Sequence, residues 1–103
     1  MNGGTYARIL ETLYGAIDRV NPQLEKSRRL QKAENTPLLG DGSNLDSMGL
    51  ISFTVEVEQA MLDKFEKTVN LAEILAESDN PAESPLRSVG SLAEYLRTRI
   101  EMT

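Results

Sequence analysis

The chain has 103 residues, the length of one small domain, and 40% of them are apolar, which suffices for one modest core. It contains no Cys and no His, which excludes disulfides, thiol nucleophiles and histidine-based catalytic or metal sites. No apolar run is long enough to span a bilayer, and the N-terminus lacks the apolar core of a signal peptide. We therefore expect a single cytoplasmic domain over residues 1–103, monomeric and without catalytic activity of its own.

The formal net charge of −5 is unevenly distributed along the chain. Residues 1–34 carry six Lys/Arg and four Asp/Glu, whereas residues 35–103 carry five and twelve. An acidic surface of this size disfavours nucleic acid, whose phosphates need cationic side chains. It suits a partner with a basic surface, although a merely solvated acidic surface would look the same in sequence.

Helical spacing begins in the first twenty residues. One predicted face of a helix starting near Thr5 holds Tyr6, Leu10, Leu13, Ile17 and Val20. Asn21-Pro22 should end this helix, because Pro lacks an N–H and disfavours helix in the residue before it.

A long connection, residues 21–46, follows. Pro22 is predicted to open a short extra helix over residues 22–33, capped by Asn21 and anchored by Leu24 and Leu30. Its basic residues are interpreted as solvated. Leu38 and Leu39 should then attach the chain to the core before a turn at residues 40–43.

The second helix is predicted to run from Asp46 or Ser47 to about Lys64. Four apolar residues share its core face: Leu50, Phe53, Val57 and Met61. A second apolar stripe lies beside that face: Met48, Ile51, Val55 and Leu62. The polar face is expected to hold Gly49, Ser52, Glu56, Gln59 and Asp63.

Two further helices complete the predicted fold. Asn70 should cap a short third helix, LAEILAE, with Glu73 in capping-box position, and this helix should end by residues 79–81. The last helix should start near Ser88. The sequence thus predicts an all-α, four-helix up-down bundle with three main helices, a short third helix and a long first connection. The predicted core comprises Leu10, Leu13, Ile17, Leu50, Phe53, Val57, Met61, Phe65, Leu92 and Leu96.

The pair Asp46-Ser47 admits two interpretations. Asp and Ser are preferred N-cap residues, so a structural cap is the simpler one. The second is that Ser47, which follows a long connection and adjoins the extra apolar stripe, is a site of covalent attachment. That stripe exceeds what a core needs and could face a partner.

The motif LDSMGLISF, residues 45–53, resembles the attachment site of the acyl carrier proteins and the related peptidyl carriers. The resemblance extends over most of the chain, with FEKTVN at 65–70 and RSVGSLAEYL at 87–96 similar to later parts of that family. It implies a four-helix bundle whose Ser47 carries a 4′-phosphopantetheine arm, with Asp46 assisting the modifying phosphopantetheinyl transferase. Gly49 and Asn70 depart from the family pattern, which favours an acidic residue and Pro at these positions.

The resemblance also implies partners. We expect acyl-loading and acyl-transferring enzymes of lipid or secondary-metabolite biosynthesis, with basic surfaces, to contact Met48, Ile51, Val55 and Glu56. Glu58 is a weaker candidate, because it points between the two apolar stripes, where we expect the bundle to hold it. Two alternatives remain open: a peptidyl carrier loaded with an amino acid, and an acidic helical interaction module without a cofactor.

Overall fold

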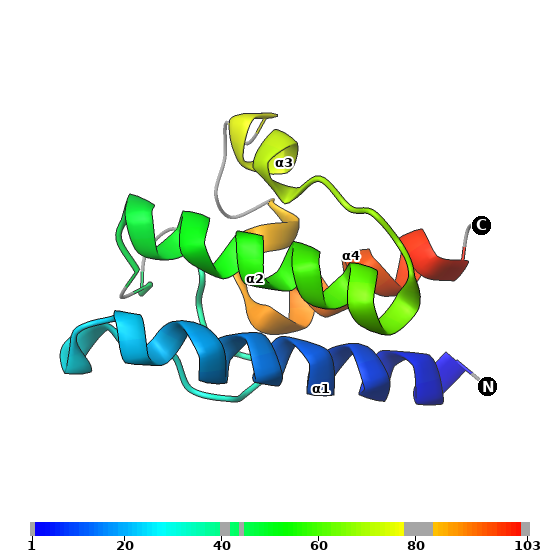
Figure 1. Ribbon diagram of the computed structural model, residues 1–103, viewed down its shortest axis with the longest axis horizontal. Coiled ribbons are helices and arrows are strands. Elements are labelled where there is room, and N and C mark those ends of the chain that lie inside the picture. The colour runs from blue at the N-terminus through cyan, green and yellow to red at the C-terminus, as the bar shows by residue number, and fades with distance from the viewer. Residues whose placement is uncertain (1, 40–41, 44, 78–83, 102–103) are drawn as a thin grey trace.

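The structure is a computed structural model that describes residues 2–39, 42–43, 45–77 and 84–101. These described residues form four α-helices: α1 (Asn2–Val20), α2 (Ser47–Phe65), α3 (Leu71–Glu77) and α4 (Val89–Glu101) (Figure 1). Short 3₁₀ turns, η1 (Asn21–Gln23), η2 (Lys26–Arg28) and η4 (Pro85–Arg87), lie in the connections. The described residues contain no β-strand, only an isolated bridge between Pro37 and Ser88. The all-helical fold predicted from the sequence is confirmed.

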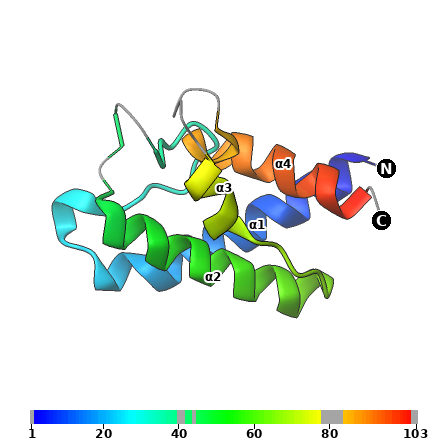
Figure 2. The ribbon, with the colours of Figure 1, turned by 90° about the horizontal axis from the view of Figure 1, so that it is seen from above.

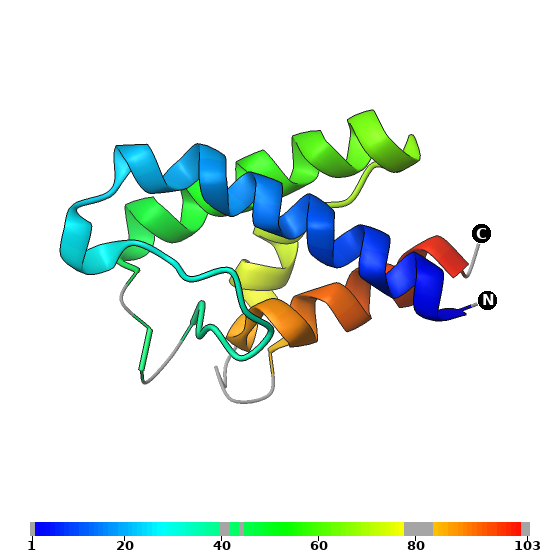
Figure 3. The same ribbon diagram turned by 90° about the horizontal axis from the view of Figure 1, so that it is seen from below.

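The three long helices differ in direction. α1 packs against both α2 and α4, and it runs opposite to both (Figures 1 and 2). α3 is short and contacts α2 and η4. As a result α1 begins and α4 ends at one end of the molecule, whereas α2 begins at the other end, next to η1 and η2 (Figure 3).

The core lies where these helices meet. Eight of the ten predicted core residues are buried: Leu13, Ile17, Leu50, Phe53, Val57, Met61, Leu92 and Leu96. The prediction was wrong for Leu10 and Phe65, which are only partly buried at the edge of the core. In α1, Ile9 and Ala16 are fully buried instead. α1 is covered by two helices, so its buried surface is wider than one stripe of apolar residues.

Local sequence signals set the helix boundaries. Asn70 Oδ1 accepts a hydrogen bond from Glu73 N (3.1 Å) at the start of α3, and Ser88 Oγ accepts one from Ser91 N (3.2 Å) at the start of α4. α1 ends at Val20 as predicted, but it begins at Asn2, earlier than Thr5. The expected end of the third helix near residues 79–81 lies outside the described residues.

The first connection does not form the predicted helix. η1 and η2 are single turns separated by extended backbone at Leu24 and Glu25. Asn21 is not an N-cap: its side-chain amide accepts from Leu30 N (2.8 Å) and donates to Leu30 O (3.0 Å), which closes a loop. Leu30 is thereby buried and Leu24 packs on the core, so both predicted anchors are confirmed.

The rest of this connection is fastened to the start of α4. Leu38 N donates to Arg87 O (3.0 Å), Val89 N to Thr36 O (3.0 Å) and Gly90 N to Glu34 O (2.7 Å). A Cβ at Gly90 would lie 3.0 Å from Glu34 O, so the close approach depends on glycine. Leu38 is buried and Leu39 partly buried, which confirms their predicted role. Of the predicted turn at residues 40–43, Gly40 and Asp41 lie outside the described residues.

The hydroxyl group of Tyr6, which lies in this region, has a raised pKa. The Tyr6 hydroxyl of α1 donates to Glu34 Oε1. This hydrogen bond, followed by burial and the negative charge of Glu34, raises the pKa of Tyr6 to about 12. Tyr6 therefore stays neutral at pH values well above those at which a tyrosine ordinarily loses its proton.

Candidate functional site at the start of α2

The start of α2 has the geometry that the sequence predicts. Asp46 is extended (φ −85°, ψ −178°), and its Oδ1 accepts a hydrogen bond from Gly49 N at 2.7 Å. Asp46 is therefore the N-cap, and Ser47 is the first residue of the helix. The side chain of Ser47 lies outside the described atoms, but its backbone begins the 19-residue helix, at the positive end of the helix dipole.

Gly49 was predicted to lie on the polar face of α2, but it is buried. A Cβ added there would lie 3.2 Å from Leu24 Cδ2, from Leu45 Cδ2 and from Asp46 Oδ1. The first connection thus packs directly against the first turn of α2. A side chain at residue 49 would crowd this contact, because its neighbours would have to move by a few tenths of an ångström.

Arg28 of η2 also reaches the start of α2. Its Nη1 lies 3.5 Å from Asp46 Oδ2, and its Nε lies 3.9 Å from Glu25 Oε2. The basic residues of the connection were predicted to be merely solvated. This was wrong for Arg28, for Arg29, whose Nε donates to Asn21 O (3.1 Å), and for Lys32, whose Nζ pairs with Asp18 (3.2 Å). Nothing in the sequence links Arg28 to Asp46, since they are far apart in the chain and share no periodic pattern.

A shallow groove of about 300 Å³ opens where the connection meets α2. Its lining residues are Gln23, Leu24, Glu25, Arg28, Asp46, Met48, Gly49 and Ser52. The residues on both sides of Ser47 therefore belong to the groove wall. The lining combines one cation, two carboxylates (Glu25 and Asp46), polar amide and hydroxyl groups, and two apolar side chains.

An exposed apolar stripe, defined as Met48, Ile51, Val55 and Leu62, runs along α2. The relative exposures are 71%, 49%, 45% and 53%. The core face of the same helix is fully occupied by other residues, so the stripe is surplus to the core, as predicted. Four large exposed apolar residues on one helix are typical of a surface that contacts a partner.

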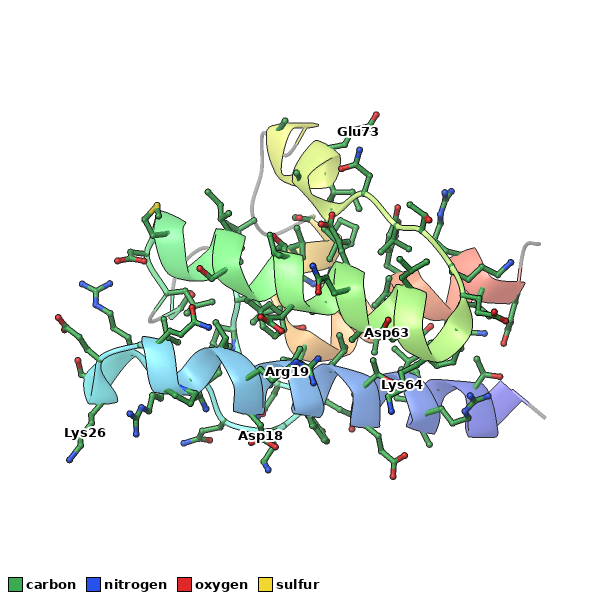
Figure 4. All side chains as sticks on the ribbon, viewed as in Figure 1. Asp18, Arg19, Lys26, Asp63, Lys64 and Glu73 are labelled. Carbon is green, nitrogen blue, oxygen red and sulfur yellow. The ribbon has the colours of Figure 1, made fainter. Side chains whose placement is uncertain are left out.

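The two acidic candidates on α2 have partners inside the molecule. Glu56 Oε1 accepts from Arg19 Nε of α1 at 2.8 Å, and Arg19 lies between the two helices (Figure 4). Glu58 Oε2 accepts from Leu71 N at 2.7 Å, at the start of α3. The expectation that the bundle holds Glu58 is confirmed, whereas the pairing of Glu56 was missed.

Two other serines lie near Ser47 in the sequence. Ser43 Oγ donates to Leu38 O (2.9 Å) and accepts from Leu45 N (3.2 Å), so its hydroxyl stabilises the connection. Ser52 is half-buried in the groove wall, more than one turn inside α2. Neither shares the position of Ser47 at the helix start.

No protein-family model, curated protein or solved structure matches this chain. The function proposed below rests on the residues and on the geometry of the start of α2.

Proposed function

We propose that this protein is a non-catalytic acyl carrier whose Ser47 bears a 4′-phosphopantetheine arm. The single observation that carries the proposal is the placement of Ser47. It opens a long helix directly after a capping Asp46, beside an apolar stripe on the same helix that remains exposed. When attached, the arm supplies the thiol that holds an acyl group as a thioester, and the chain itself has no Cys.

The start of α2 suits a phosphodiester on Ser47. The unpaired N–H groups and the dipole of a helix N-terminus favour an anion by roughly 0.3–1 kcal/mol. Asp46 caps the helix through Oδ1, and its Oδ2 faces Arg28. In the proposed reaction Asp46 helps the transferase engage its metal and substrate, so one residue would serve both the fold and the modification.

The wider fold supports the same proposal. A carrier would have its four helices in up-down order, and the opposed directions of α1 and α2 agree with this order. Enzymes that load or use the acyl group would dock on the exposed stripe of α2. Residues 41–83 hold ten acidic and two basic side chains, which favours partners with basic surfaces.

The mass of the intact protein, co-produced with a phosphopantetheinyl transferase, tests this proposal. We expect the mass to rise by one phosphopantetheine group in the parent chain and in Ser43→Ala and Ser52→Ala variants. Ser47→Ala should remain unmodified but folded by circular dichroism, because Asp46 still caps α2. Modification of Ser47→Ala, or attachment mapped to another serine, would overturn the assignment.

The exposed stripe also favours a second candidate, an acidic helical interaction module without a cofactor. That candidate requires no covalent group, so an unchanged mass in the presence of an active transferase would select it. A peptidyl carrier would share Ser47 with an acyl carrier. The group released from the thioester, identified by mass spectrometry, would separate these two.

A further inference from the structure

Arg28 is the side chain through which the long first connection reaches the attachment site. Its guanidinium stands between Glu25 and Asp46, with the closer approach, 3.5 Å, to Asp46 Oδ2. The Arg28 and Asp46 side chains are 44% and 54% exposed, so water screens the pair and holds it weakly. A guanidinium held this weakly can also bind a second anion that lies beside it.

The groove next to this ion pair has a lining of mixed chemistry. Leu24 and Met48 are apolar, Gln23 and Ser52 offer amide and hydroxyl groups, and the carboxylates of Glu25 and Asp46 lie beside Arg28. A pantetheine arm has the same alternation: a phosphodiester, a dimethyl group with a neighbouring hydroxyl, and two amides. Arg28 stands in this groove together with Asp46 and Met48, the two neighbours of Ser47.

We propose that Arg28 binds the phosphodiester on Ser47 and that the groove holds the first part of the arm against α2. This inference rests on the proposed function. In the unmodified chain Arg28 pairs with Asp46. After modification its forked N–H donors bind the phosphodiester, since guanidinium matches phosphate oxygens in pairs. Leu24 and Met48 would supply apolar contacts to the arm, and Gln23 and Ser52 would supply hydrogen-bonding groups for its amides.

The packing at Gly49 places the groove close to the attachment site. A Cβ at residue 49 would lie 3.2 Å from Leu24 Cδ2, so a side chain there would push Leu24 away from the first turn of α2 by a few tenths of an ångström. The loop closed by Asn21 and Leu30 fixes the two ends of the segment that carries both Leu24 and Arg28. The connection is therefore fixed beside the start of α2. In this proposal it gives the arm a surface to bind, in contrast to a carrier whose arm extends freely into solvent.

The test compares amide chemical shifts of the ¹⁵N-labelled intact chain before and after modification by a transferase with coenzyme A. In the parent chain we expect modification to shift the amides of Gln23, Leu24 and Arg28 as well as those next to Ser47. In Arg28→Gln the shifts on the connection should be lost, while those next to Ser47 remain.

Lys26→Gln is the matched control. Lys26 lies in the same turn and carries the same charge, but it points away from α2 (Figure 4). We expect its pattern of shifts on modification to equal that of the parent chain. An equal loss in Lys26→Gln would show that only the general positive charge of the connection matters, which would overturn the role of Arg28.

The remaining outcomes separate the inference from the proposed function. Modification that shifts only α2 residues in the parent chain would overturn the inference and leave the carrier function standing. Loss of modification in Arg28→Gln alone would also overturn it, because Arg28 would then act in recognition by the transferase. A parent chain that accepts no group would overturn the function and the inference together.

Discussion

Asp46 combines two tasks that substitutions can separate. Asp46→Ala removes the acceptor of Gly49 N and should lower the free energy of unfolding by about 0.5–2 kcal/mol. Asp46→Asn keeps a good cap but removes the negative charge. We therefore expect Asp46→Asn to retain most of the stability in urea unfolding while its modification by the transferase becomes slower.

Equal rates of modification for Asp46→Asn and the parent chain would show that the carboxylate acts only as a cap. Ser47 would then remain the proposed attachment site, with Asp46 excluded from the reaction.

The two phenylalanines differ in burial and should differ in their contribution to stability. Phe53 is fully buried, so Phe53→Ala should cost about 3–5 kcal/mol in urea unfolding. Phe65 is partly buried, with the guanidinium of Arg8 4.9 Å from its ring centre, so Phe65→Ala should cost clearly less. Equal losses for the two variants would contradict the position of Phe65 at the core edge.

Tyr6 gives the protein a pH dependence in the alkaline range. The hydrogen bond to Glu34 raises the pKa of Tyr6 from 10.0 to about 12 in the folded state, so the folded state keeps the proton longer than the unfolded state. This contribution to stability is complete below pH 10 and is lost as the pH rises towards 12. Urea unfolding across this range should show a steeper loss for the parent chain than for Tyr6→Phe, which cannot titrate.

The short α3 depends on a side chain of α2. Glu58 Oε2 accepts from Leu71 N, which is one of the N–H groups that a helix start leaves unpaired. Glu58→Ala should therefore loosen α3 and speed amide hydrogen exchange in residues 71–74, with little change in α1. Glu58→Gln keeps a carbonyl acceptor and should retain more protection. Unchanged exchange in Glu58→Ala would show that Asn70 alone suffices to start α3.

Helices were predictable from sequence where their signals are local. Capping residues at Asp46, Asn70 and Ser88 mark three starts, and Asn21-Pro22 marks the end of α1. Eight of the ten residues that apolar spacing assigned to the core are buried, but a single stripe could not show that α1 is covered by two helices. Packing partners, and not the helix's own pattern, decide how wide its buried face is.

The first connection was not predictable in the same way. Its shape depends on Asn21 with Leu30, on Glu34 with Gly90 and on Arg28 with Asp46, pairs that are separated in sequence and follow no period. Helix propensity favoured a short helix over residues 22–33, and these tertiary contacts overrode it. The sequence thus predicted Ser47, Asp46 and the stripe as parts of the candidate site. It did not predict the groove or the position of Arg28.

At the scale of the whole molecule, the stripe on α2 is the expected docking surface. Ile51→Ala and Val55→Ala, shown to be folded by circular dichroism, should slow modification or acyl loading at any salt concentration. The reason is that apolar side chains at the centre of a contact usually dominate its energy. Normal loading rates in both variants would exclude this helix as the docking surface.

Charge should act differently from the stripe, because salt screens exposed charges beyond about 8–10 Å. Glu56→Lys should slow loading mainly at low salt, and part of its effect will come from the lost pair with Arg19. Asp63→Lys is the matched control, because it makes the same charge change at a position that lies about 24 Å from Ser47 along the axis of α2. An equal, salt-dependent defect in Asp63→Lys would indicate a response to net charge alone.

The opposed directions of α1 and α2 also determine how the protein can be tethered. α1 begins and α4 ends at one end of the 37 Å long axis, and Ser47 lies towards the other end. An affinity tag, a fluorophore or a surface linker joined through either terminal helix would project away from the start of α2. Immobilised through such a linker, the chain would present the stripe and the groove to enzymes in solution, so binding and loading could be followed on a sensor surface without blocking Ser47.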